Sequence, residues 1–111
     1  MRGKIANKEH ILKMYIKLHK SYRTVVAVCD TDLIGKKFEE GRRQLDVREN
    51  FYKGDEIDSE KSIELMQNYA NEDATFNIVG KESVSTALKA GIINQSSVTK
   101  ISGVPFALTL L

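Results

Sequence analysis

Cysteine and proline are almost absent from this sequence of 111 residues, and each scarcity excludes a class of protein. The one cysteine, Cys29, has no disulfide partner within the chain, so the fold does not rely on the cross-links of small secreted domains. The one proline, Pro105, leaves no proline-rich linker. We therefore expect one domain that buries its own core in a reducing compartment, and we predict a cytoplasmic protein.

Long apolar runs are missing as well. None approaches the roughly 20 residues that a membrane-spanning helix needs, so we expect no membrane partner. Near the N-terminus, Ile11 and Leu12 form too short an apolar region for a signal peptide. We interpret residues 1–13 as a basic N-terminal extension of a single α+β domain over residues 14–111.

Residues that carry catalysis or bind metals are sparse. His10 and His19 are the two histidines, and no group of His, Cys, Asp and Glu has the spacing of a zinc site. The sequence also lacks a nucleophile elbow, a metalloprotease helix and the signatures of kinases and phosphate-binding loops. We therefore predict no catalytic residue, no metal and no cofactor, and the sequence favours a binding protein over an enzyme.

The stretch over residues 74–93 organises the predicted fold. An apolar, β-branched run before Gly80 is typical of a buried strand, and a helix is predicted over residues 81–90. Gly91 follows the last periodic residue directly, which predicts a left-handed helix C-cap with positive φ. The buried face of this helix is expected to carry Val84, Ala87 and Leu88.

Two strands over residues 14–19 and 24–29 form a predicted hairpin with a four-residue loop. This loop length places Cys29 on an apolar face with Met14, so we expect the thiol to be buried. The same register separates Cys29 from His19 by about 17 Å, which is too far for a nucleophile and its base. The expected pairs are His19 with Thr24, Leu18 with Val25, Ile16 with Ala27 and Met14 with Cys29.

The rest of the chain adds strands and one more helix. A third strand opens at Gly41 with Leu45 and Val47 pointing inward, and residues 98–101 and 106–110 form a closing hairpin.

The additional helix is predicted over residues 59–71, with Asp58 or Ser59 as its N-cap. Together these elements predict an α+β fold, a mainly antiparallel sheet of about five or six short strands with two helices on one face. The buried stripe of this helix is expected to comprise Ile63, Met66 and Ala70.

The chain also carries a set of short motifs: Val28-Cys29-Asp30, Asp32-Leu33-Ile34-Gly35-Lys36, Glu40-Gly41, Leu45 with Val47, Phe51-Tyr52, Asn77-Ile78-Val79-Gly80 and Gly103-Val104-Pro105-Phe106-Ala107. As a set they resemble the archaeal family catalogued as domain of unknown function 424, and the resemblance covers residues 14–111. It implies a small archaeal cytoplasmic α+β domain without an established activity, in the company of translation and ribosome-assembly factors.

Two acidic patterns invite a chemical interpretation. Asp30, Asp32 and Gly35 match the opening of a calcium loop, but Ile34 and Gly41 stand where that loop needs oxygen ligands. A turn in which the aspartates bind nearby backbone N–H groups is therefore favoured. Neighbouring carboxylates flanked by lysine and arginine are typical of a solvated surface, as at Glu39-Glu40 and Asp55-Glu56.

The junction at Gly80 joins a strand to a helix N-terminus, where unpaired N–H groups and the helix dipole attract anions. Asn77 and Ser83 are candidate helpers for a phosphate or carboxylate ligand. One glycine is far short of a phosphate-binding loop, and the alternative is that Gly80 only turns the chain.

The charge distribution is lopsided. Residues 1–23 carry a net charge of +6, and the remaining residues carry −4, which together make the +2 of the chain. Aromatic side chains interleave with these cations, a mixture that suits unpaired bases and phosphates of RNA. The predicted RNA-binding residues are Lys17, His19, Lys20, Tyr22 and Arg23.

Three functions stay open at this point. The leading prediction is a non-enzymatic protein that binds RNA or a ribosomal particle and is linked to translation, with no DNA specificity expected. One alternative is a small anionic-ligand-binding protein or enzyme that uses a pocket near Gly80, with Asp30 or Asp32. The other is a protein-interaction adaptor that uses the hairpin and Phe51-Tyr52. The sequence does not determine the oligomeric state.

Overall fold

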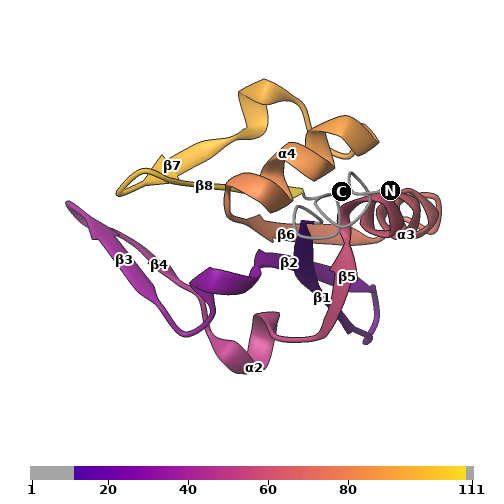
Figure 1. Ribbon diagram of the computed structural model, residues 1–111, viewed down its shortest axis with the longest axis horizontal. Coiled ribbons are helices and arrows are strands. Elements are labelled where there is room, and N and C mark those ends of the chain that lie inside the picture. Colours follow the sequence, from indigo (N-terminus) through magenta and orange to yellow (C-terminus); the bar gives the residue numbers. More distant parts are fainter. Residues whose placement is uncertain (1–11, 110–111) are drawn as a thin grey trace, which may run out of the picture.

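A computed structural model describes residues 12–109, which form a sheet of six strands and a smaller sheet of two. The order in the large sheet is β5-β1-β2-β6-β8-β7, and its neighbouring strands are antiparallel except for the parallel pair β2 and β6. The helices α3 (Ser59–Ala70) and α4 (Lys81–Ala90) contribute to the same core on one face of this sheet (Figure 1). The predicted α+β fold is confirmed. The strands are β1 (Lys13–His19), β2 (Val25–Asp30), β5 (Asp55–Asp58), β6 (Thr75–Val79), β7 (Thr99–Ile101) and β8 (Val104–Thr109).

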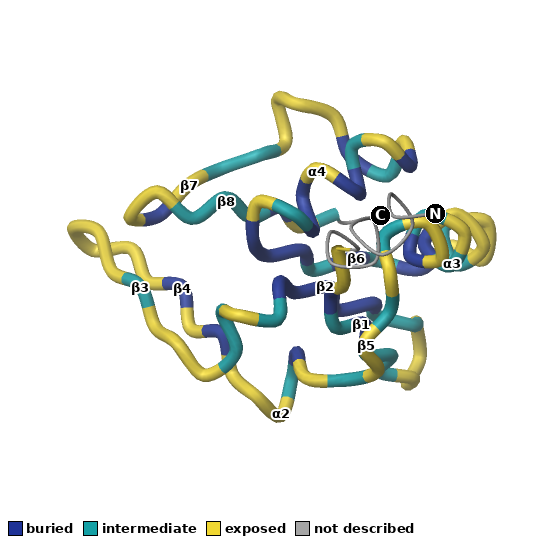
Figure 2. The backbone as a smooth tube through the Cα atoms, in the orientation of Figure 1, coloured by how far each residue is buried: buried dark blue, intermediate teal, exposed yellow. Residues whose placement is uncertain are grey.

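The central strands are buried on both faces, which explains their continuous apolar sequence (Figure 2). On the helix side, Val26, Val28 and Ile78 pack with Met66 of α3 and Val84 of α4. No helix within residues 12–109 is long and apolar enough to cross a membrane.

The opposite face is covered by an insertion between β2 and β5, which comprises β3 (Lys37–Glu40), β4 (Arg43–Asp46) and the short helix α2 (Glu49–Tyr52). Leu45 and Val47 are buried as predicted, and they form a second core. This core also contains Ala27, Cys29, Tyr52, Val79 and Ile101.

The tip of the β3–β4 hairpin is joined to the β7–β8 hairpin, and both hairpins project from the same side of the molecule (Figure 1). The backbone N–H of Ser102 donates to the Glu40 carboxylate at 2.6 Å, and the Ser102 hydroxyl donates to the Glu39 carbonyl at 2.6 Å. The insertion is therefore held at its far end as well as at its base.

The predicted register of the β1–β2 hairpin is wrong by one residue. Met14 lies opposite Asp30, and Tyr15 lies opposite Cys29, because the loop has five residues instead of four. A slip of one residue moves a strand's side chains to the other face, so Cys29 faces the insertion and not Met14. Its predicted burial is confirmed, with no exposed surface. The other observed pairs are Ile16 with Val28, Lys17 with Ala27, Leu18 with Val26 and His19 with Val25.

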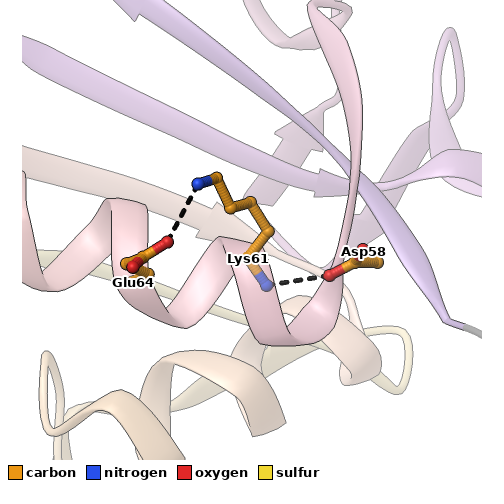
Figure 3. A network of polar contacts seen from close by, with 3 residues as sticks. All are labelled: Asp58, Lys61 and Glu64. Carbon is orange, nitrogen blue, oxygen red and sulfur yellow. Dashed lines mark hydrogen bonds and ion pairs between the residues drawn. The ribbon is translucent and has the colours of Figure 1, made fainter.

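Helix α3 begins as predicted. The Asp58 side chain accepts a hydrogen bond from the Lys61 backbone N–H at 2.8 Å, and the Lys61 ammonium lies 2.9 Å from the Glu64 carboxylate (Figure 3). Met66 is fully buried as predicted, but Ile63 is only half-buried and Ser62 is fully buried. The Ser62 hydroxyl can occupy this position because it donates to the Ile57 carbonyl at 3.5 Å.

The end of α4 is also confirmed, because Gly91 has a φ of 78° and its backbone N–H donates to the carbonyls of Ala87 and Leu88 in the last turn of the helix. The closing hairpin is longer than predicted. Its turn consists of Ser102 and Gly103, both with positive φ, so β8 begins at Val104. The predicted end of this hairpin, Leu110, lies outside the described residues, as do residues 1–11 of the predicted extension. Lys13 already belongs to β1.

Candidate nucleic-acid interface

The β1–β2 loop presents the exposed part of the predicted RNA-binding set. Tyr22 is 100% exposed, and Lys20 and Arg23 on either side of it are exposed too. A fully exposed tyrosine ring buries no apolar surface in the isolated chain, so it stabilises the fold little. The loop is therefore free to contact a partner without a rearrangement of the core.

The other two predicted residues lie on β1 and contact α2. The His19 ring stacks on the Phe51 ring with a centroid separation of 4.3 Å and an interplanar angle of 12°. His19 Nε2 lies 2.8 Å from the Phe51 carbonyl oxygen, which can only accept, so Nε2 carries the proton. The Lys17 ammonium donates to the Asn50 carbonyl at 2.7 Å. These contacts fix α2 against β1.

Beside this stack lies an open pocket of about 490 Å³, which we call the α2 pocket. Its size falls in the range of small-molecule sites. The Tyr52 ring packs edge-on to Phe51, with centroids 4.9 Å apart, and burial raises the pKa of its hydroxyl to about 12. The hydroxyl is therefore neutral at physiological pH. The pocket is lined by His19, Asp46, Arg48, Asn50, Phe51 and Tyr52.

Sequence reasoning missed part of this pocket. Asp46 and Arg48 were recognisable only as outward-pointing residues near the end of a strand, and Asn50 carried no signal. Phe51-Tyr52 was recognisable as an aromatic segment, but its place against His19 depends on the return of the insertion to β1. Contacts between residues more than 30 positions apart, such as Lys17 with Asn50, leave no local pattern.

The anion site predicted at Gly80 is already occupied by a carboxylate of the chain itself. Asp30, at the end of β2, accepts hydrogen bonds from the backbone N–H groups of Glu82 at 3.1 Å and Ser83 at 2.8 Å. It also accepts a hydrogen bond from the Ser83 hydroxyl at 2.7 Å. Asn77 is not brought to this point, because it lies on the insertion side of β6, between Phe76 and Ile78 of the helix-side core. Asp30 is thus a cap for α4, and not part of a local turn.

This cap explains the glycine at position 80. Gly80 has a φ of 107°, and a Cβ at this position would fall on the Asp30 carboxyl group. A neighbouring pocket of about 420 Å³ offers an anion little attraction, because carboxylates outnumber ammonium groups in its lining. It is lined by Leu12, Lys13, Asp30, Thr31, Asp32, Glu56, Lys81 and Glu82.

Cys29 lies beneath the insertion as a neutral thiol. Burial, together with the nearby charges of Asp30 and Asp32, raises its pKa from 9.0 to about 12. A thiol with this pKa has almost no thiolate at pH 7, so Cys29 is not a nucleophile.

With this geometry established, comparison with known proteins places the chain. It matches the family described as "Protein of unknown function (DUF424)" over residues 19–110. The protein belongs to the DUF424 family. The match spans residues 19–110, so residues 14–18 and residue 111 of the predicted resemblance lie outside it.

A solved structure has a fold similar to that of this DUF424 protein. It is the crystal structure of an uncharacterized conserved protein from Methanopyrus kandleri, with a TM-score of 0.79 and 22% sequence identity. The alignment covers 87% of this chain and 90% of that chain, so the likeness extends over nearly the whole fold. No curated protein matches the chain.

Proposed function

We propose that this DUF424 protein binds RNA, free or within a ribosomal particle, through the β1–β2 loop and the adjoining α2 pocket. The observation that carries the proposal is the fully exposed Tyr22 between two exposed cations, Lys20 and Arg23. An exposed aromatic ring can stack on an unpaired base, while cations on each side neutralise its flanking phosphates.

The strand that leads into the loop supports the same ligand. His19 lines the α2 pocket with Arg48, so the aromatic and cationic character of the loop continues into a concave surface. The stacked pair of His19 and Phe51 is held by a hydrogen bond, which keeps the ring planes fixed before a ligand arrives. Single-stranded or looped RNA suits this arrangement better than duplex DNA, whose bases are not available for stacking.

The proposed cellular setting is the cytoplasm of an archaeon, with a link to translation. The buried thiol of Cys29 suits a reducing compartment. The archaeal origin and the link to translation rest on the family resemblance of the sequence motifs. Co-sedimentation with ribosomes from the native source tests this setting separately from RNA binding itself.

The test is the salt dependence of affinity for a single-stranded RNA. The double variant Lys20→Gln with Arg23→Gln should flatten the slope of log affinity against log salt by about 1.4, since each phosphate contact contributes about 0.7. Tyr22→Ala should lose about 1 to 3 kcal/mol of binding free energy with little change in slope. Lys17 is left intact because its ammonium donates a hydrogen bond to the Asn50 carbonyl, which holds α2 against β1.

The matched control removes two exposed cations elsewhere, Lys89 on α4 and Lys100 on β7. If Lys89→Gln with Lys100→Gln flattens the slope as much as the loop variant, RNA attraction is a general property of the surface. That outcome, or an unchanged affinity in the loop variant, would refute the proposed interface.

A further inference from the structure

The lining of the α2 pocket combines three planar rings, those of His19, Phe51 and Tyr52, with one carboxylate. His19 and Phe51 stack on each other, and Tyr52 packs edge-on against Phe51. A pocket walled by fixed aromatic rings favours a flat ligand. Asp46 is the one carboxylate in the lining.

Asp46 is available to a ligand at little cost. Its only polar side-chain contact among residues 12–109 is an ion pair with Arg48 at a long 3.7 Å. The side chains of Asp46 and Arg48 are 43% and 70% exposed, so this pair contributes little to stability and can separate. An ionised carboxylate only accepts hydrogen bonds, so it seeks a ligand edge rich in donors.

The bases differ in the number of donors they offer to such a group. The Watson–Crick edge of guanine carries two adjacent donors, the N1–H and the N2 amino group, which match the two oxygens of a carboxylate. Adenine and cytosine each offer one amino group there, and uracil offers one ring N–H. A bidentate pair of hydrogen bonds discriminates far better than a single one.

We propose that the α2 pocket binds an unpaired guanine, with Asp46 accepting hydrogen bonds from its N1–H and N2 amino groups. Because His19 and Phe51 stack on each other, the base contacts this pair from outside it. The exposed Arg48 guanidinium, released from Asp46, contacts a phosphate. This inference rests on the proposed function and adds a base specificity to it.

The experiment compares short oligouridine strands that carry one central guanine, inosine, adenine or cytosine, with binding followed by fluorescence anisotropy at fixed salt. Guanine should raise the affinity about tenfold over adenine. Inosine, which lacks the N2 amino group, should lose most of that gain. Asp46→Asn should abolish the preference for guanine, so that the strands with guanine, inosine and adenine bind with affinities within about twofold of one another.

Asp55→Asn is the matched control, because it removes an exposed carboxylate that lies outside the α2 pocket. This variant should keep the preference for guanine. Equal affinities for the four strands, with the loop-dependent salt slope intact, would overturn the guanine site and leave RNA binding standing. Absence of binding to every strand would overturn both.

Guanosine monophosphate distinguishes a base within a strand from a free nucleotide. It should bind at least a hundredfold more weakly than the guanine-containing strand, because it lacks the phosphates that contact the loop. If guanosine monophosphate binds as tightly as the strand and depends on Asp46, the guanine site stands and RNA as its ligand is refuted.

Discussion

Removal of the Asp30 carboxylate is the sharpest test of how the central strands hold α4. This side chain is 6% exposed and accepts three hydrogen bonds, two from backbone N–H groups and one from the Ser83 hydroxyl. A buried donor that loses its partner costs about 1 to 3 kcal/mol, and water entering the site recovers part of this loss. We expect Asp30→Ala to lower the free energy of unfolding by about 3 to 5 kcal/mol.

The chain contains a matched control for this cap. Asp58 caps α3 through one hydrogen bond to the Lys61 N–H, but it is exposed, so water can replace it. Asp58→Ala should cost only about 1 kcal/mol. At about 4 °C per kcal/mol, thermal unfolding should show a loss of about 12 °C or more for Asp30→Ala and about 4 °C for Asp58→Ala.

Gly80→Ala tests the same cap without changing Asp30, because the new Cβ would displace the Asp30 carboxyl group. It should destabilise to a similar degree as Asp30→Ala, and the double variant should cost less than the sum of the two. If Asp30→Ala is no worse than Asp58→Ala, the carboxylate does not hold α4, and the structural explanation of Gly80 is wrong.

Two further predictions concern stability. The pKa of Cys29 rises from 9.0 to about 12 on folding, so the thiol stabilises the fold fully below pH 9, and this contribution is lost as the pH rises toward 12. Denaturant unfolding between pH 8 and 10 should show this loss in the wild type and a flatter profile in Cys29→Ala, and parallel profiles would contradict the buried thiol. Gly91→Val should cost more than about 1 kcal/mol in the same assay, because a β-branched residue tolerates positive φ poorly, and an unchanged midpoint would contradict this helix end.

Local patterns in the sequence were sufficient to predict the fold class, the start of α3 and both ends of α4. They did not predict β3, α2 or β5, and the strand predicted to open at Gly41 begins at Arg43. Gly91 and Asp58 were identifiable because a helix cap depends on residues within one turn of it. The inward positions of Leu45 and Val47 followed from the alternation of a strand.

Features set by distant contacts could not be predicted in the same way. The register of the β1–β2 hairpin depends on whether Thr24 belongs to the loop. The Thr24 carbonyl accepts a hydrogen bond from the backbone N–H of Thr75 in β6, which is a contact between distant parts of the chain. The role of Asp30 depends on α4, more than 50 residues further along the chain. Without that contact, the sequence favoured a local turn for Asp30 and joined Asp30 to Gly80 only in the alternative of an anion pocket.

The candidate site likewise has one part that local sequence patterns predict and one part that depends on distant contacts. Lys20, Tyr22 and Arg23 were identifiable from composition, because a polar loop between two apolar strands is exposed in almost any packing. The α2 pocket was not, because its walls come from β1 and from an insertion about 30 residues later.

The central claim, that RNA binds at the β1–β2 loop and the α2 pocket, is tested most directly by NMR. A titration of the labelled protein with a single-stranded RNA should shift the amide signals of Tyr22, Arg23, Arg48 and Phe51 in a saturable way. Signals around Lys81 at the capped end of α4, and around Lys89 on its exposed face, should stay in place. Shifts confined to those α4 residues, or no saturable shift at any RNA concentration, would contradict the account.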